Sequence, residues 1–96
     1  MRKVFLSVPM SGKTEAEIRK EIDYLKSFAD SKTDLCVDNF IDAPWYGSQL
    51  YCLGEAIKKL GYCDVIFMHP DWKSAKGCRV EEFVAREYGI EVVYIK

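Results

Sequence analysis

Residues 4–17 read VFLSVPMSGKTEAE, an apolar run followed directly by a turn and the start of a helix. The run from Val4 to Val8 has the continuous hydrophobicity of a strand buried on both faces of a sheet. Thr14 and Glu17 have the spacing of a capping box, in which each side chain bonds the other residue's backbone N–H. The stretch therefore predicts a strand, a tight turn and a helix, which is the opening of an α/β unit.

The same alternation continues along the chain. Further strand-like runs occupy 35–37, 64–68 and 91–95, and helical patterns occupy 14–30, 48–60 and 77–88. The apolar stripes expected to face the sheet are Ile18, Ile22, Leu25 and Ala29, then Leu50, Leu53, Ile57 and Leu60, then Val80, Phe83, Val84 and Tyr88. The element order β-α-β-α-β-α-β predicts one domain over 1–96, a small flavodoxin-like three-layer sandwich with a parallel sheet of about four strands.

Right-handed crossovers place the carboxyl ends of parallel strands at one edge of the sheet, where ligands bind in such folds. That edge should collect residues 7–13, the loop that carries Trp45 and Tyr46, and residues 69–76.

Composition excludes several classes of protein. The chain has 96 residues, a net charge of −1, and is 49% hydrophobic and 30% charged, which argues against disorder and against a generally basic nucleic-acid binder. It has no apolar run of about 18 residues and no signal-peptide pattern, so we expect a cytoplasmic protein with no membrane contact. The four cysteines lack metal or redox spacing and are expected to be reduced and mostly buried. We expect no metal and no cofactor.

Residues 7–14 partly match a phosphate-binding P-loop after a strand and before a helix. Ser7 replaces the first glycine of that motif, and Pro9 removes a backbone N–H that would cradle phosphate. The favoured interpretation is a tight turn in which Gly12 permits an unusual backbone angle.

A second group of residues surrounds the start of the last helix. Glu81 should project near the ligand edge beside Gly77, whereas Glu82 should face water. A shielded carboxylate there can act as a nucleophile on a sugar carbon, or can simply favour the positive end of the helix dipole. Three basic side chains around the same helix start can hold a phosphate or form a solvated rim: Lys73, Lys76 and Arg79.

The loop aromatics Trp45, Tyr46 and Trp72 can stack a nucleobase, cap the core or form a subunit contact. His69 follows the third strand with no partner identifiable in the sequence, so we interpret it as structural or incidental.

The opening run 4–12 resembles the Tyr-Leu-Ser-Gly-Pro-Met-Ser-Gly opening of the nucleoside 2-deoxyribosyltransferase-like superfamily, and especially its short members of unassigned function. The runs 63–72 and 77–81 are similar to the second signature of that family, and 85–94 is similar to its ending. The resemblance covers nearly the whole chain.

This resemblance implies a flavodoxin-like fold and a nucleoside or nucleotide as small-molecule partner, with no polymeric nucleic acid. Characterised relatives cleave or transfer the N-glycosidic bond of a deoxynucleoside or its monophosphate, and they assemble as homo-oligomers. Glu81 falls on the position of the nucleophilic glutamate, which parallels retaining glycosidases. The implied substrate-binding residues are Phe5, Ser7, Pro9, Met10, Gly12, Asp71, Trp72, Ser74 and Gly77.

The chain departs from the family pattern at four positions: Phe5 for a tyrosine, Val8 for a glycine, Ala75 for a serine, and Ala56 for an aspartate. These changes remove a hydroxyl and an acid that assist base departure in active relatives, and general acid–base help is typically worth about 10²–10⁴-fold. The alternative to an enzyme is therefore a non-catalytic nucleotide-binding or oligomeric interaction module.

Overall fold

A computed structural model describes residues 1–38 and 49–96 of the chain. Its elements are β1 (Arg2–Ser7), α1 (Glu15–Lys26), β2 (Asp34–Asp38), α2 (Gln49–Leu60), β3 (Val65–Met68), the 3₁₀ turn η1 (Trp72–Ser74), α3 (Lys76–Glu87) and β4 (Glu91–Tyr94). This order confirms the predicted α/β alternation.

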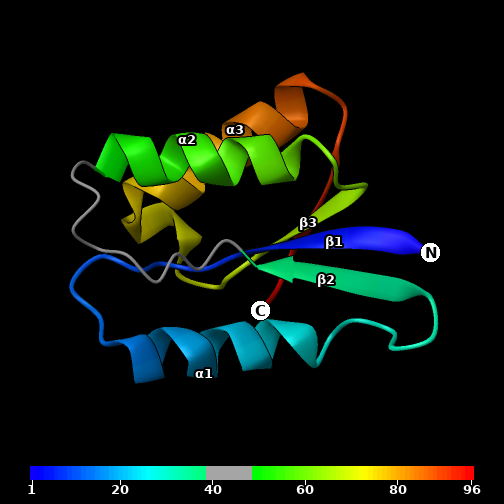
Figure 1. Cartoon of the computed structure of the whole chain (residues 1–96), viewed down its shortest axis with the longest axis horizontal. Helices are drawn as coiled ribbons and strands as arrows, with labels where there is room; N and C mark the ends of the chain where they lie inside the picture. Colours follow the sequence, from blue (N-terminus) through cyan, green and yellow to red (C-terminus); the bar gives the residue numbers. More distant parts are fainter. Residues whose placement is uncertain (39–48) are drawn as a thin grey trace.

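The four strands form one parallel sheet in the order β2-β1-β3-β4. The chain first moves from β1 to β2 on one side, then returns past β1 to β3 and β4 on the other. This reversal makes the carboxyl ends of β1 and β3 the topological switch point, the place where open α/β sheets leave a crevice for ligands. Figure 1 shows β1 between its neighbours near the centre of the molecule.

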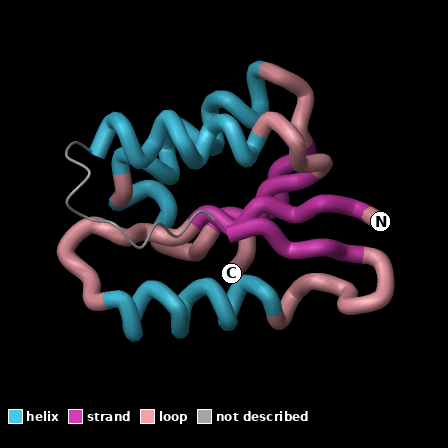
Figure 2. The backbone as a smooth tube through the Cα atoms, viewed as in Figure 1, coloured by secondary structure: helices cyan, strands magenta, loops and turns pink. Residues whose placement is uncertain are grey.

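Helices cover both faces of the sheet and give the predicted three layers (Figure 2). The face under α1 buries Val4, Leu6 and Phe67 against Ile22 and Leu25. The face under α2 and α3 has a second core, made of Phe5, Ala56, Leu60, Cys63, Ile66, Met68, Cys78 and Ala85. Alternate residues of β1 therefore serve opposite cores, as expected for a strand buried on both sides.

The turn after β1 and the start of α1 form as the sequence predicts. Thr14 accepts a hydrogen bond from the Glu17 backbone N–H, and Glu17 accepts one from the Thr14 N–H, which completes the capping box. Gly12 adopts φ +76°, a conformation that costs glycine little. The helix ends at Lys26 rather than near Ser31, because the Ser27 hydroxyl donates to the Tyr24 carbonyl at 2.5 Å and competes with the helical pattern.

The predicted inward face of α3 is wrong except at Val84, which is half-buried against the core under α2 and α3. The buried residues are Cys78, Glu81, Glu82 and Ala85, which lie at helical spacing, whereas Phe83 and Tyr88 are 53% and 81% exposed. Glu82 does not face water and is only 5% exposed. Apolar periodicity misplaces this helix because two glutamates with hydrogen-bond partners occupy its inner row.

The predicted stripe of α2 is correct only in part. Leu60 is fully buried and Ala56 nearly so, and Leu53 and Ile57 are half-buried. Leu50 is 74% exposed, so the first turn of the helix does not pack on the sheet through this side chain.

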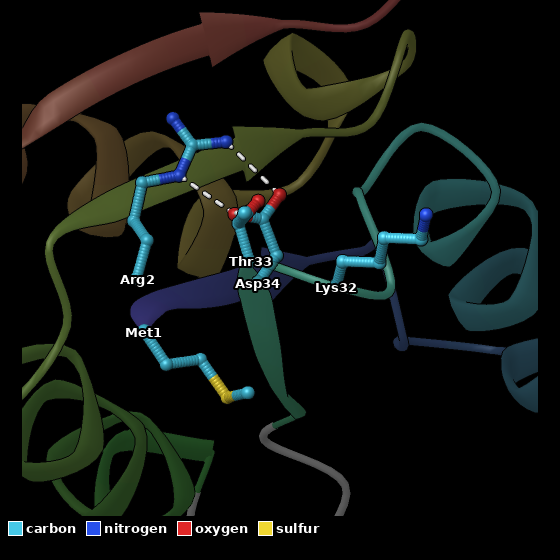
Figure 3. A pocket seen from close by; sticks show the side chains of 5 residues that line it. All are labelled: Met1, Arg2, Lys32, Thr33 and Asp34. Atoms are coloured by element: carbon cyan, nitrogen blue, oxygen red, sulfur yellow. Dashed lines mark hydrogen bonds and ion pairs between the residues drawn. The ribbon is translucent and has the colours of Figure 1, made fainter.

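An ion pair fastens the amino edge of the sheet, at the opposite end from the switch point. Arg2 Nε and Nη2 donate to Asp34 Oδ1 and Oδ2, both at 3.0 Å, and join β1 to β2. Asp34 Oδ2 also accepts the Asp30 backbone N–H at 3.0 Å, which fixes the turn between α1 and β2. Figure 3 shows the open hollow around this pair, lined by Met1, Arg2, Lys32, Thr33 and Asp34. Because Arg2 and Asp34 already bond each other, we interpret this ion pair as a structural clamp between β1 and β2, and not the hollow as a binding site.

Stability should therefore depend on pH through Asp34. The hydrogen bonds from Arg2 hold the pKa of Asp34 below its ordinary value, so this carboxylate contributes stability at neutral pH and loses that contribution as the pH falls below about 4. We expect Asp34→Asn to be less stable than the native chain at pH 7, by a difference that shrinks as the pH falls through the acid range. Urea unfolding at several pH values measures this difference.

The matched control is Asp23→Asn, which alters an exposed carboxylate of α1. A difference between the native chain and Asp34→Asn that stays constant from pH 7 into the acid range would contradict the proposed clamp.

Candidate functional site

The carboxyl ends of β1 and β3 lie side by side at the switch point. Ser7 pairs with Met68 in the parallel register, and the His69 backbone N–H donates to the Ser7 carbonyl at 3.1 Å. Ser7 is fully buried. It shares the face of β1 that carries Phe5, because side chains alternate along a strand, and this face is the one covered by α3.

Glu81 reaches this point from the inner row of α3. Its carboxylate Oε1 accepts a hydrogen bond from Ser7 Oγ at 2.6 Å, across 74 residues of sequence. Glu81 is only 3% exposed, so its charge depends on fixed protein partners rather than on bulk water. Charge-assisted bonds of this length are among the stronger hydrogen bonds in proteins, and this one ties the end of β1 to α3.

Cys78 lies one turn before Glu81 in the same buried row. Burial raises the pKa of the Cys78 thiol to about 12, and the Glu81 charge acts in the same direction, while the Ser7 hydroxyl opposes it. The thiol therefore stays protonated at neutral pH. Two weaker electrostatic effects on the pKa of this thiol oppose each other, because Lys13 lowers it and Glu21 raises it.

His69 has partners that its sequence position did not reveal. Its Nδ1 accepts the Asp71 backbone N–H at 3.0 Å, and its Nε2 lies 3.9 Å from Glu21 Oε2. The other oxygen of Glu21 binds Lys13 Nζ at 2.5 Å. Glu21 Oε2 is shielded and has no hydrogen-bond partner among the residues that the structure describes. Only the tertiary fold shows that α1 supplies the carboxylate facing this histidine.

The substrate-binding residues predicted on β1 and in the turn after it do not gather at one place, because they differ in burial and in the core they contact. Phe5 is fully buried in the core under α2 and α3. Pro9 is buried, Met10 is half-buried against the core under α1, and Gly12 is exposed. Of this group, Ser7 makes the direct contact with Glu81.

The predicted contacts after β3 form a short ordered loop. Ser74 Oγ donates to the Asp71 carbonyl at 2.7 Å, and both residues are exposed. Trp72 is half-buried, with its ring centroid 5.6 Å from that of Tyr94. Gly77 is in the first turn of α3, where a Cβ would meet the Leu53 side chain at 3.9 Å, so this glycine faces α2.

Glu82 belongs to a separate network on the β4 side of α3. It accepts hydrogen bonds from the Tyr94 hydroxyl and from Arg86 Nε, the latter at 2.9 Å. The bond to Glu82 raises the pKa of Tyr94 above its ordinary value. The contact with Tyr94 joins α3 to β4. The two adjacent buried glutamates therefore bind α3 to different strands, Glu81 to β1 and Glu82 to β4.

Two sequence predictions fall outside the described residues: the loop aromatics Trp45 and Tyr46, and the start of the second helical pattern at residue 48. Within 1–38 and 49–96, no group of three or more His, Cys, Asp or Glu side chains is placed to hold a metal ion. No described helix has the length and hydrophobicity that a membrane span requires. In the same residues the cysteines are free, with Cys63 and Cys78 buried.

Comparison with known families gives one match. The family model "Domain of unknown function (DUF4406)" matches residues 2–94. The chain belongs to the DUF4406 family. No curated protein and no solved structure matches it.

The residues that match the DUF4406 model include both Ser7 and Glu81, which are joined by a hydrogen bond. A carboxylate held by a hydroxyl in a buried site has a fixed orientation, which suits either of two roles. It can attack an electrophilic carbon as a nucleophile, or it can tie a helix to a strand end. In either role, the hydrogen bond to Ser7 fixes one oxygen of the Glu81 carboxylate.

The free energy of unfolding tests that hydrogen bond directly. We expect Ser7→Ala and Glu81→Met, which removes the acceptor at similar side-chain length, to destabilise the chain, and the double variant to lose less than the sum of the two. The coupling should be about 1.5–3 kcal/mol, the usual value for a hydrogen bond to a charged group. Ser74→Ala, at an exposed hydroxyl, combined with Glu81→Met serves as the control pair. Equal additivity in both pairs would show that the bond between Ser7 and Glu81 does not stabilise the fold.

Thiol labelling tests the burial at Cys78. A pKa of about 12 leaves roughly one thiol in ten thousand ionised at pH 8. We expect iodoacetamide to leave Cys78 unmodified in the folded chain and to label it in denaturant, as followed by peptide mass spectrometry. Rapid labelling of Cys78 in the folded chain would show that the row containing Glu81 is open to solvent.

Proposed function

We propose that this chain binds a nucleoside or nucleotide at the carboxyl edge of its sheet and cleaves or transfers the N-glycosidic bond with Glu81 as nucleophile. One observation carries the proposal: a buried carboxylate bonded to Ser7 Oγ at 2.6 Å beside the β1–β3 switch point. The resemblance to nucleoside 2-deoxyribosyltransferase-like proteins assigns the same glutamate to that role, and both support a substrate at this edge.

The proposed reaction has two displacements. A carboxylate oxygen of Glu81 bonds to the anomeric carbon, and the C–N bond breaks with its electron pair going to the base, which takes a proton from water. A second base or a water molecule then attacks the same carbon and releases the carboxylate, and it gives up its proton to the hydroxide that the first step left. Ser7 is the positioning residue in this scheme, because its hydroxyl holds one carboxylate oxygen through the bond that the structure records.

A second candidate function is favoured by a specific observation. Phe5 and Ala56 stand where active relatives carry a hydroxyl and a carboxylate, and both are buried in the core under α2 and α3. Neither side chain can assist the departing base. This arrangement supports a nucleotide-binding module without turnover, in which Glu81 holds the site together.

Base release separates the two candidates. Deoxynucleosides and their monophosphates are incubated with the native chain, Glu81→Gln and Glu82→Gln, and free base is measured by chromatography. If Glu81 is the nucleophile, Glu81→Gln should lose about 10⁴-fold or more of the rate. Glu82→Gln is the matched control, because it removes the neighbouring buried carboxylate that serves β4.

Thermal unfolding with the same compounds supplies the binding readout. A ligand that binds only the folded state raises the unfolding temperature, whether or not it turns over. Stabilisation without base release supports the binding module and removes the enzyme. No stabilisation and no base release across the panel would contradict both functions.

A further inference from the structure

The outer face of α3 carries a straight stripe that the core does not use. Lys76, Val80, Phe83 and Glu87 follow one another at spacings of four, three and four residues, opposite the buried row that contains Glu81. Val80 is 40% exposed and Phe83 is 53% exposed. The two charged residues are also exposed. The stripe is therefore an apolar centre with a cation at one end and an anion at the other.

Each charge of the stripe stands at the helix end that disfavours it. Lys76 is the first residue of α3 and Glu87 is the last. The helix dipole favours anions near the amino end and cations near the carboxyl end, so both positions are electrostatically adverse in an isolated helix. Neither residue forms an ion pair within the residues that the structure describes.

We propose that this stripe is the contact between two copies of this chain, with their α3 helices antiparallel across a two-fold axis. The spacing is the same when it is counted from either end, so the stripe matches itself when reversed. Val80 of each copy then meets Phe83 of the other, and Lys76 of each meets Glu87 of the other. A two-fold interface requires this kind of self-complementarity.

The antiparallel arrangement removes both adverse features at once. Lys76 comes to lie beside the negative carboxyl end of the second helix, and Glu87 beside the positive amino end. The exposed rings and branched side chains at the centre become buried, as is usual at the core of an interface. The contact is on the face of α3 opposite Glu81, so it does not depend on the proposed function.

Sedimentation velocity over a concentration series tests the surface. We expect the native chain to form dimers and Phe83→Glu to weaken association by at least about tenfold, since central aromatic residues dominate interface energies. Tyr62→Glu is the control, because Tyr62 is 77% exposed but lies beyond α2 and outside the stripe. Circular dichroism confirms that each variant is folded.

A charge exchange tests the antiparallel pairing itself. Lys76→Glu alone and Glu87→Lys alone should each weaken the dimer, because each variant puts like charges opposite one another. The double variant Lys76→Glu/Glu87→Lys should restore association, because the pairs return with their signs reversed. A native chain that stays monomeric, a dimer that survives Phe83→Glu, or a double variant weaker than both single variants would overturn the proposal.

Discussion

The hydrogen bond from the Ser7 hydroxyl to the Glu81 carboxylate is the constraint on which the site depends. It requires β1 to end at the switch point, with Ser7 on the face covered by α3, and it requires α3 to turn its glutamates inward. A buried carboxylate without such a donor would cost several kcal/mol of desolvation, in order-of-magnitude terms. The parallel sheet, the register between β1 and β3 and the orientation of α3 are thus linked through one contact.

The two edges of the sheet have different chemistry. At the amino edge, Arg2 and Asp34 satisfy each other and fix the first two strands, so the hollow beside them presents charges that are already paired. At the carboxyl edge, Ser7, Glu81 and His69 bring a hydroxyl, a carboxylate and an imidazole from β1, α3 and the end of β3. Glu21 adds a shielded oxygen with no hydrogen bond in the described part of the chain. The amino edge therefore presents charges that are already paired, whereas the carboxyl edge carries the candidate chemistry and, through the bond between Ser7 and Glu81, also contributes to stability.

The sequence predicted correctly those features that depend only on residues close together in the chain. The capping box at Thr14, the turn at Gly12 and the runs of β1 and β3 need only short-range contacts and alternation, and all appear in the structure. The inner face of α3 depends on long-range partners instead. Glu82 is buried because Tyr94 reaches it from β4, and periodicity of apolar residues contains no information about that pairing.

The candidate site shows the same division. The sequence placed Glu81 near the ligand edge, but it did not show that Ser7 would bond it or that Glu21 would face His69. Those contacts join segments that are distant in the chain, and one sequence without its fold does not reveal them. Two of the apolar residues that periodicity assigned to the core, Val80 and Phe83, are exposed and form the centre of the surface proposed as a dimer contact.

A crystal structure of the Glu81→Gln variant, soaked with a deoxynucleoside monophosphate, shows whether a sugar can reach the side chain at position 81. We expect a sugar at the carboxyl edge, with its anomeric carbon about 3–3.5 Å from the side chain at position 81, the separation expected of a reactive arrangement. A nucleotide bound instead in the hollow beside Arg2 and Asp34, with Ser7 still in contact with residue 81 and no sugar near it, would exclude Glu81 as the nucleophile.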